Sequence, residues 1–391
     1  MASRTDAAAA LAARLARLQG FLQQDPDNLR LLADVADAQI QLGLLDDART
    51  TLGHTLTLQP TDPQARYGLA VVDLAQQQLD DALRGLQSLM AQGHGQPAVR
   101  WTLARCLAAL KDWPKAREAL ASPGFDELPE GLLDDWALLR IRATHHCGDI
   151  DAALDLVHQW QALCGERGLP LTGRAAWATL LLDAEQTEQA ATVLAQCPAS
   201  DITSNAELAS VAGYVALADG QGAQALASFR RSRELQPMDA RAALGEGLAA
   251  AVLGQSDLAL QSIRTATQAN PSHLGSWHAL AWMQLLDQDI AGAEASIQAA
   301  MAQDDTFGES HGALALIHVL RDRADDARSH LRTALRLNPR GFNAMVAQWM
   351  LAHHENVLSP QVLAKLQQAF EAQAARTDPA LGLLLKRWRP Q

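Results

Sequence analysis

Few residues of this sequence have types and spacing that could do chemistry, and the clearest is a serine between two glycines. Residues 308–312 read GESHG, the GxSxG spacing that presents a nucleophilic serine in many hydrolases. That chemistry needs a sharp turn from a strand into a helix, with a histidine, an acid and an oxyanion hole supplied from elsewhere. No strand pattern precedes Gly308, so we interpret the spacing as coincidence and expect no nucleophile at Ser310.

Histidines occur in two clusters that resemble parts of metal sites. His145 and His146 precede Cys147, and residues 353–355 read His-His-Glu. Adjacent side chains on a helix point about 100° apart, so one ion would need ligands from other parts of the chain. No HxD, HExxH or CxxC spacing supplies them, and the four cysteines lie at irregular intervals. The sequence therefore predicts no metal site and no disulfide framework.

Two glycine pairs partly match a dinucleotide-binding fingerprint. Gly220 and Gly222 are followed by Ala225 at the required interval, and Gly245 and Gly247 form a second pair. A pyrophosphate site requires such glycines to follow a strand and to open a helix. Neither pair follows a strand pattern, so we expect turn and packing glycines. With no catalytic residue and no cofactor predicted, the chain is not expected to be an enzyme.

The composition indicates that helices hold these residues. Alanine, leucine and glutamine dominate the 391 residues, only 4% are aromatic, and runs of β-branched residues are almost absent. A net charge of −12 disfavours nucleic-acid binding, which needs a dense basic surface. No apolar stretch predicts a membrane span, and residues 1–26 lack the apolar core of a secretory signal. We expect a cytoplasmic protein, and the preference for arginine over lysine hints at a bacterial source.

An internal repeat organises the chain. Alanine recurs at intervals of 34, 34, 37, 37, 35, 34, 34 and 34 residues, and twelve residues before each alanine lies a second position that is small except at Ile141. Two small residues at fixed places let paired helices approach closely. The repeat alanines are Ala48, Ala82, Ala116, Ala153, Ala190, Ala225, Ala259, Ala293 and Ala327. The second positions are Ala36, Ala70, Ala104, Ile141, Ala178, Gly213, Gly247, Ala281 and Ala315.

Turn residues keep the same phase as the alanines. Glycine suits the C-cap of a first helix, and in four repeats it lies five residues before the alanine, at Gly43, Gly148, Gly220 and Gly254. Proline twelve residues after the alanine marks the end of a second helix, at Pro60, Pro237, Pro271 and Pro339. Pro63 and Pro97 suit a first helical position. The repeat therefore predicts pairs of amphipathic helices.

These features resemble the tetratricopeptide repeat, a helix-turn-helix of 34 residues with small residues at its eighth and twentieth positions. Trp277, Leu280, Ala281, Ala293 and Pro271 match the family pattern, and the resemblance covers residues 29–340 in about nine repeats. It implies an all-α, right-handed superhelical solenoid with helical caps. Repeats four and five depart from the pattern, so their connections at 121–133 and 164–173 are expected to be longer or irregular.

The repeat register also predicts how the chain divides. We expect an N-terminal capping helix at 1–28, repeats one to three at 29–130, and irregular repeats four and five at 131–205. Repeats six to nine then occupy 206–341, and capping helices occupy 342–391. The caps are expected because each end of a stacked array exposes an apolar face.

The resemblance implies where a partner would bind. In the family the first helix of each repeat lines a concave groove through its second, fifth, ninth, twelfth and thirteenth positions. Early in the chain these positions also include Arg30, Asp37, Gln41 and Gln64. The predicted partner-binding residues are Tyr67, Trp101, Arg105, Arg142, His145, His146, Tyr214, His278 and Trp282.

We therefore expect a non-catalytic scaffold or adaptor that binds a protein or peptide, and no nucleic acid or membrane. Arginine grips carboxylates, so the middle groove favours an acidic or C-terminal segment. The alternative that Arg105 and Arg142 only pair with acids such as Asp135 or Asp183 stays open. A dedicated accessory subunit or chaperone of an enzyme or secretion machinery is the other candidate. Ala33 and Asp37 replace the lysine and asparagine of the family's carboxylate clamp, which disfavours a chaperone co-factor.

Overall fold

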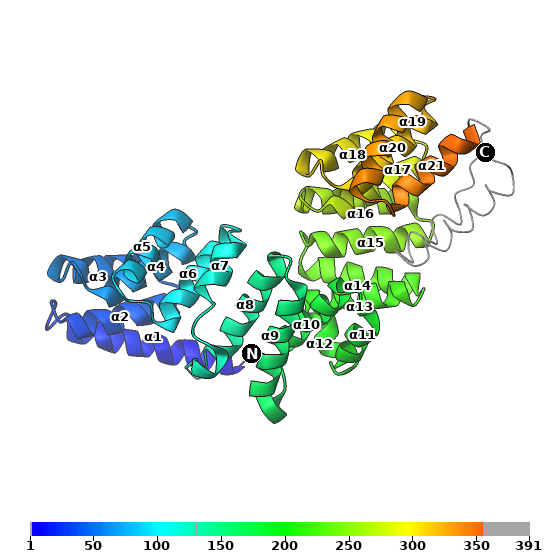
Figure 1. The fold of residues 1–391 in the computed structure, drawn as a ribbon. Coiled ribbons are helices and arrows are strands. Elements are labelled where there is room, and N and C mark those ends of the chain that lie inside the picture. The colour runs from blue at the N-terminus through cyan, green and yellow to red at the C-terminus, as the bar shows by residue number, and fades with distance from the viewer. Residues whose placement is uncertain (1, 130, 355–391) are drawn as a thin grey trace. The chain divides into compact units, whose positions relative to one another are not determined.

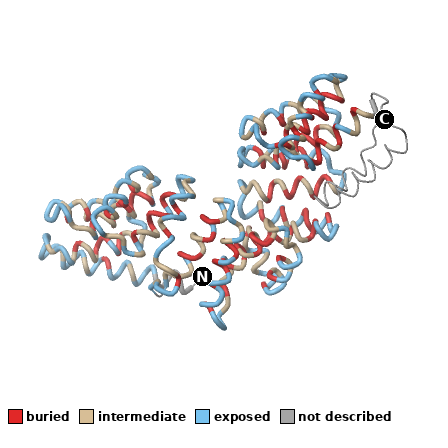
Figure 2. Tube along the Cα trace, viewed as in Figure 1, coloured by how far each residue is buried: buried red, intermediate tan, exposed pale blue. Residues whose placement is uncertain are grey.

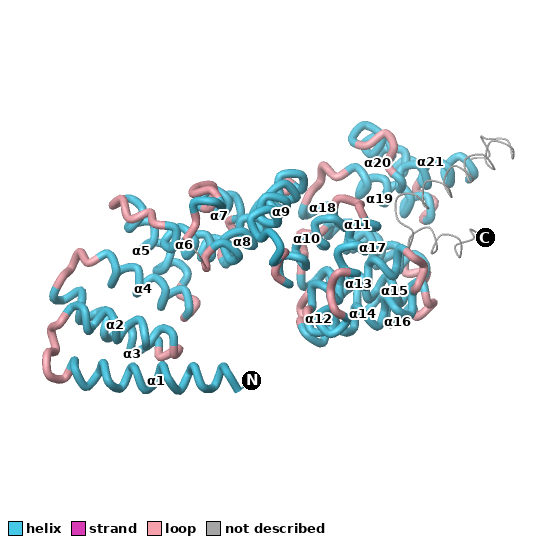
Figure 3. The backbone as a smooth tube through the Cα atoms, turned by 90° about the horizontal axis from the view of Figure 1, so that it is seen from below, coloured by secondary structure: helices cyan, strands magenta, loops and turns pink. Residues whose placement is uncertain are grey.

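The computed structural model describes residues 2–129 and 131–354, and its regular elements there are all helices (Figures 1 and 3). The helices as far as residue 183 are α1 Ala2–Leu22, α2 Leu29–Gln41, α3 Leu45–Leu58, α4 Pro63–Ala75, α5 Leu79–Ala91, α6 Pro97–Ala109, α7 Trp113–Ala119, η1 Phe125–Glu127, α8 Leu133–His146, α9 Ile150–Cys164, η2 Gly165–Arg167 and α10 Leu171–Asp183. Those that follow are α11 Thr187–Ala195, α12 Ala199–Ser204, α13 Ala206–Ala218, α14 Gly222–Leu235, α15 Ala240–Val252, α16 Ser256–Ala269, α17 Leu274–Leu286, α18 Ile290–Gln303, α19 Gly308–Leu320, α20 Ala324–Leu337 and α21 Phe342–His354. The predicted all-α class is confirmed.

Consecutive helices pack as pairs. From α2 to α9, and again from α13 to α21, each pair packs on the next, as in a helical solenoid. In the earlier region α2 pairs with α3, α4 with α5, α6 with α7 and α8 with α9. Later α13 pairs with α14, α15 with α16, α17 with α18 and α19 with α20. At the ends α1 packs on α2 and α21 packs on α19 and α20. The number of repeats and the handedness stay predictions.

The chain forms two compact parts, one ending at Ala176 and the other beginning at Trp177. We call them the N-terminal part and the C-terminal part. Helix α10 spans the division, which falls inside the region where irregular repeats were expected. The five-part division predicted from the sequence stays a prediction, and the capping helix expected within 355–391 lies outside the described residues.

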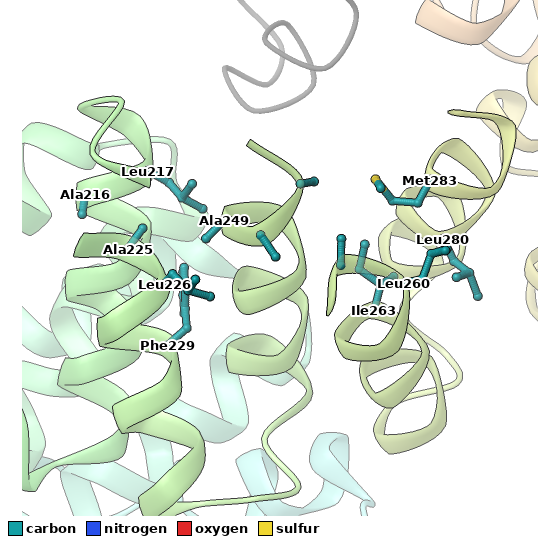
Figure 4. Close-up of a cluster of buried hydrophobic side chains, with 13 residues drawn as sticks. Ala216, Leu217, Ala225, Leu226, Phe229, Ala249, Leu260, Ile263, Leu280 and Met283 are labelled. Atoms are coloured by element: carbon teal, nitrogen blue, oxygen red, sulfur yellow. The ribbon is translucent and has the colours of Figure 1, made fainter. Parts of the chain in front are cut away.

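Small residues hold the paired helices together. All nine repeat alanines are completely buried, with exposed fractions of 0%. At Gly213 an added Cβ would come within 2.6 Å of the Phe229 ring, and at Gly247 within 2.4 Å of Ile263. Figure 4 shows Phe229 and Ile263 in the core cluster that these helices share. Figure 2 marks buried residues along the helices of both parts. The contacts at Gly213 and Gly247 confirm the expectation that small residues permit close approach.

The turn inside each repeat has one backbone geometry whatever its residue. Five residues before each repeat alanine the backbone has positive φ. Four of these residues are the predicted glycines, with φ between 72° and 79°, and the other five are Gln77, Lys111, Glu185, Gln288 and Asp322, with φ between 58° and 62°. A left-handed conformation costs an L-residue about 1–2 kcal/mol. Helix pairing therefore imposes this turn even where glycine is absent.

Proline marks helix ends and starts as predicted. The helices α3, α14, α16 and α20 each end two residues before their proline, and Pro63 and Pro97 begin α4 and α6. The middle of the chain departs from the regular helix pairs. Helix α7 is short and is followed by η1, and η2 precedes α10. The extra helix α12 was not predicted.

Candidate partner-binding site

Trp101 and Arg105 lie one turn apart on α6 and form the centre of the candidate site. Pro97 starts this helix, and Ala104 fixes its inward face with an exposed fraction of 0%. The guanidinium carbon of Arg105 stands 4.6 Å from the centroid of the Trp101 ring, within cation–π range. Arg105 is exposed and Trp101 is half-buried. Within residues 2–129 and 131–354, Arg105 has no carboxylate partner.

Helix α8, which contacts α6, carries Arg142, His145 and His146 near its C-terminal end. The ring of His146 stacks on Trp113 of α7 with centroids 3.9 Å apart and an interplanar angle of 14°. The pKa of His146 is lowered, first by partial desolvation and then by the positive charges of His145 and Arg142. Three basic groups therefore crowd one helix end, and an incoming carboxylate would relieve their repulsion. We call Trp101, Arg105, Trp113, Arg142, His145 and His146 the α6–α8 surface.

Two acids, Asp135 and Asp183, were considered as internal partners for Arg105 and Arg142. Asp183 forms an ion pair with Arg241, at 2.7 Å between oxygen and nitrogen. Arg105 pairs with neither Asp135 nor Asp183 in the described residues, whereas for Arg142 the internal alternative stays open. Arg105 is therefore the better candidate for an intermolecular contact.

Three of the early groove residues line a pocket of about 410 Å³ between α2, α3 and α4. Arg30, Asp37 and Gln64 all line it, together with Asp34 and Asp62. The pKa of Asp37 is raised, first by burial and then by the charge of Asp34, while Arg14 acts against both. The pocket is thus acidic, opposite in charge to the α6–α8 surface.

Tyr67 lies between these two sites in the register and is partly used by the fold. Its hydroxyl lies 3.0 Å from Oγ1 of Thr102 and 3.4 Å from the carbonyl oxygen of Ala98. Both atoms belong to α6, so the hydroxyl ties α4 to the start of that helix. The half-buried ring is what Tyr67 can still offer to a partner.

Three predicted groove residues lie in the C-terminal part, and their side chains make contacts within the chain. They are Tyr214, His278 and Trp282. The hydroxyl of Tyr214 donates to the carbonyl oxygen of Arg241 at 2.9 Å, and the ring meets Phe229 edge-on. His278 contacts Phe307 edge-on. Trp282 is only 7% exposed and belongs to a core cluster with Phe342. This burial leaves Trp282 little surface for a partner.

Ser310 has a histidine neighbour that its local sequence does not reveal. Nε2 of His278 lies 3.0 Å from Oγ of Ser310, and Nδ1 lies 3.4 Å from the side-chain nitrogen of Asn343. Ser310 is completely buried in the first turn of α19, where no substrate reaches Oγ. Burial also lowers the pKa of His278 to about 4, which keeps the ring neutral. The contact connects α17, α19 and α21. Because Ser310 is buried, it is not the exposed nucleophile that a hydrolase needs.

The remaining motifs mostly have structural roles. Gly220 is in a turn and Gly222 opens α14, while Gly245 and Gly247 lie inside α15 against Phe229 and Ile263. The expectation of turn and packing glycines is confirmed. For the cluster at 353–355, Glu355 and the side chains of the two histidines lie outside the described residues.

Two groups were missed from the sequence. Trp113 forms part of the α6–α8 surface because its ring stacks on His146. A second group joins His311, His318 and His330 of α19 and α20, where the pKa of His330 is lowered by burial and then by the other two rings. These histidines lie seven and twelve residues apart in the sequence, which matches no familiar spacing of metal ligands.

Comparison with known proteins identifies the repeat. Family models of the tetratricopeptide repeat match residues 2–70, 73–126 and 211–273. The chain is a tetratricopeptide-repeat protein. Among solved structures it is similar to YrrB, described as a TPR protein with an unusual peptide-binding site, at 16% identity and a TM-score of 0.37, over 46% of this chain and 92% of that chain. Comparison with curated proteins gives no match.

The repeat class supports a protein-interaction scaffold, since stacked repeats of this kind present extended binding surfaces. Within residues 2–354 apart from residue 130, no helix is both long and apolar enough to cross a bilayer. The cytoplasmic location and bacterial source stay predictions.

Proposed function

We propose that this chain is a scaffold whose protein partner docks on the α6–α8 surface. The Arg105–Trp101 pair carries the proposal, because Arg105 is exposed, is held on an aromatic ring, and lacks a carboxylate partner in the described residues. Tryptophan and arginine commonly supply much of the energy of protein interfaces. A pre-positioned arginine loses less conformational freedom on binding than a mobile one.

The chemistry of the α6–α8 surface favours an acidic segment or a C-terminal carboxylate. A guanidinium can donate two parallel hydrogen bonds to one carboxylate. Arg142, His145 and His146 would add positive potential next to it. Because the nearby positive charges contribute to the lowered pKa of His146, a bound carboxylate should raise that pKa. Binding should therefore tighten as pH falls through 6.5, the ordinary pKa of histidine.

The acidic pocket of the same N-terminal part adds an element of selectivity. Asp34, Asp37 and Asp62 would favour a basic side chain, while the α6–α8 surface favours an acidic one. A partner segment with a basic residue and an acidic residue at separate places would satisfy both. An unbroken run of acids would be repelled at the pocket.

The first experiment is affinity capture from native lysate with the wild-type chain and an Arg105→Glu/Arg142→Glu variant. We expect one stoichiometric partner on the wild type and at least tenfold less on the variant. The matched control is Arg84→Glu/Arg328→Glu, which makes the same charge change at arginines paired with Asp81 and Asp325. Equal retention by all three proteins would move the interface away from the α6–α8 surface.

The chemistry of the partner is then tested with peptides from the captured protein. Fluorescence anisotropy would compare a free C-terminal carboxylate with its amide, and acidic residues with their amide counterparts. Loss of binding on amidation alone identifies a C-terminal segment, and loss on neutralising internal acids identifies an acidic segment. Affinity that neither change affects would contradict the proposal of carboxylate recognition.

A further inference from the structure

Three histidine rings gather between α19 and α20, away from the proposed partner site. Nδ1 of His311 lies 3.2 Å from Nδ1 of His330, with ring centroids 5.5 Å apart. The ring of His318 stacks on His330 with centroids 5.3 Å apart. The helix pair brings together residues of positions 311, 318 and 330, and the grouping plays no part in the function proposed above.

Hydrogen bonding defines the proton position on His311. Its Nε2 lies 3.0 Å from the backbone carbonyl oxygen of Asp305, which can only accept. Nε2 therefore carries the hydrogen, and Nδ1 presents a lone pair toward His330. This is the outer-shell hydrogen bond that orients metal-bound imidazoles and raises their basicity.

The spacing of the two Nδ1 atoms fits two ligands of one metal ion. Two metal–nitrogen bonds of about 2.0–2.1 Å at a tetrahedral angle place the nitrogens about 3.3 Å apart. The observed 3.2 Å is close to that value. The same distance also fits a direct hydrogen bond in which His330 donates, so the ion would replace one N–H···N contact. His330 would then carry its hydrogen on Nε2.

His318 supplies an independent observation at the same place. It is 8% exposed, and its Nδ1 is buried without a hydrogen-bond partner in the described residues. Burying a ring nitrogen without a hydrogen-bond partner costs free energy, so such an atom calls for a structural or functional reason. Stacked on His330, the His318 ring limits the orientations that His330 can adopt. His311 and His330 are half-buried, so an ion can reach them from solvent.

We propose that His311 and His330 bind a divalent late transition-metal ion, Zn²⁺ or Cu²⁺, through their Nδ1 atoms. Imidazole nitrogen suits these ions, and copper binds most tightly in the usual affinity order. In the described residues no three side chains of His, Cys, Asp or Glu are placed to hold a metal. Water or a residue of a bound protein therefore completes the coordination.

The test is isothermal titration of the full chain with ZnCl₂ at pH 7.5. We expect one ion per chain, with affinity at least tenfold lower in His311→Asn and in His330→Asn. The control is His54→Asn, which removes a partly exposed histidine paired with Asp27 and should leave the titration unchanged. Absence of binding by the wild type at 1 mM ion, or equal affinity in the double variant His311→Asn/His330→Asn, would overturn the proposal.

A second measurement separates this site from loose surface binding and from misfolding. Electron paramagnetic resonance of the chain with one equivalent of Cu²⁺ should show superhyperfine splitting from two nitrogens, and fewer nitrogens in each single variant. Circular dichroism would show whether the variants keep their helices. An unchanged nitrogen pattern in a folded variant would refute the assignment of these two ligands.

Discussion

Trp101 and Arg105 of the α6–α8 surface occupy the same places in the repeat register as the C-terminal set of Tyr214, His278 and Trp282, yet the chain uses them differently. The reference point is the small residue in the first helix of each repeat, the position twelve residues before the repeat alanine. Trp101 and His278 both lie three residues before it, and Arg105, Tyr214 and Trp282 lie one residue after it. Arg105 is exposed on Trp101, whereas Trp282 is packed in a core. The register determines which way a side chain points, and its neighbours determine whether a partner can reach it.

The difference arises from the helices that follow each set. His278 meets Ser310 of α19 and Asn343 of α21, and Trp282 meets Phe342 of α21. Helix α6 is followed instead by the short α7 and by α8, which bring Trp113 and three basic side chains. The C-terminal set makes its contacts within the chain. The α6–α8 surface gathers basic side chains, and within the described residues no carboxylate pairs with Arg105.

The largest expected difference is between two tryptophans. Trp282→Ala should lower the free energy of unfolding by about 3–5 kcal/mol, because the lost ring leaves a cavity in the core. Trp101→Ala should cost about 1–2 kcal/mol, because its ring is half-exposed. Urea unfolding followed by circular dichroism measures both, and equal losses would contradict the comparison.

Acid should weaken the C-terminal set through His278. The pKa of His278 is lowered from 6.5 to about 4 in the folded chain, so between these values only the unfolded chain binds the proton. The stability contributed by the neutral ring is present at pH 7 and is lost as pH falls toward 4, by about 2–3 kcal/mol. Denaturant unfolding at pH 7 and pH 4.5 measures the loss. His278→Gln should reduce it, and an unchanged pH dependence would show that His278 is not its source.

Smaller effects are expected at the hydrogen-bonded hydroxyl of Tyr214 and at the exposed guanidinium of Arg105. Tyr214→Phe should lower the free energy of unfolding by about 1 kcal/mol, because it leaves the Arg241 carbonyl without that donor. Arg105→Ala should change it by at most about 1 kcal/mol, since the exposed cation–π contact is weak. Partner affinity should respond in the opposite order, which capture with each variant would check.

The smallest expected effect is the same in both parts. Lys111→Gly in the N-terminal part and Gln288→Gly in the C-terminal part replace residues with φ of 61° and 62°. Relief of the left-handed strain exceeds the entropy cost of glycine, so each should stabilise by about 0.5–1 kcal/mol. Thermal unfolding would measure the gain. A large difference between the two would show that the parts differ in their turns as well as in their grooves.

Local patterns in the sequence predicted most of the fold, because repeat packing is local. The alanines, the four turn glycines and the prolines all lie where the pairs need them. The left-handed turns at Gln77, Lys111 and Glu185 could not be predicted from residue type, since the helix pair imposes their conformation. Trp113 on His146 and His278 on Ser310 join positions more than thirty residues apart, and residue type alone does not reveal which side chains meet.

Packing between neighbours along the chain also determines how the molecule should respond to force. The helix pairs and the contacts between successive pairs described above connect segments that are close in sequence. A pull on the two ends would therefore load these contacts in series, and the weakest would yield first. Extension should proceed in short steps of one or two helices, so that a stretched chain keeps intact blocks while its ends move apart.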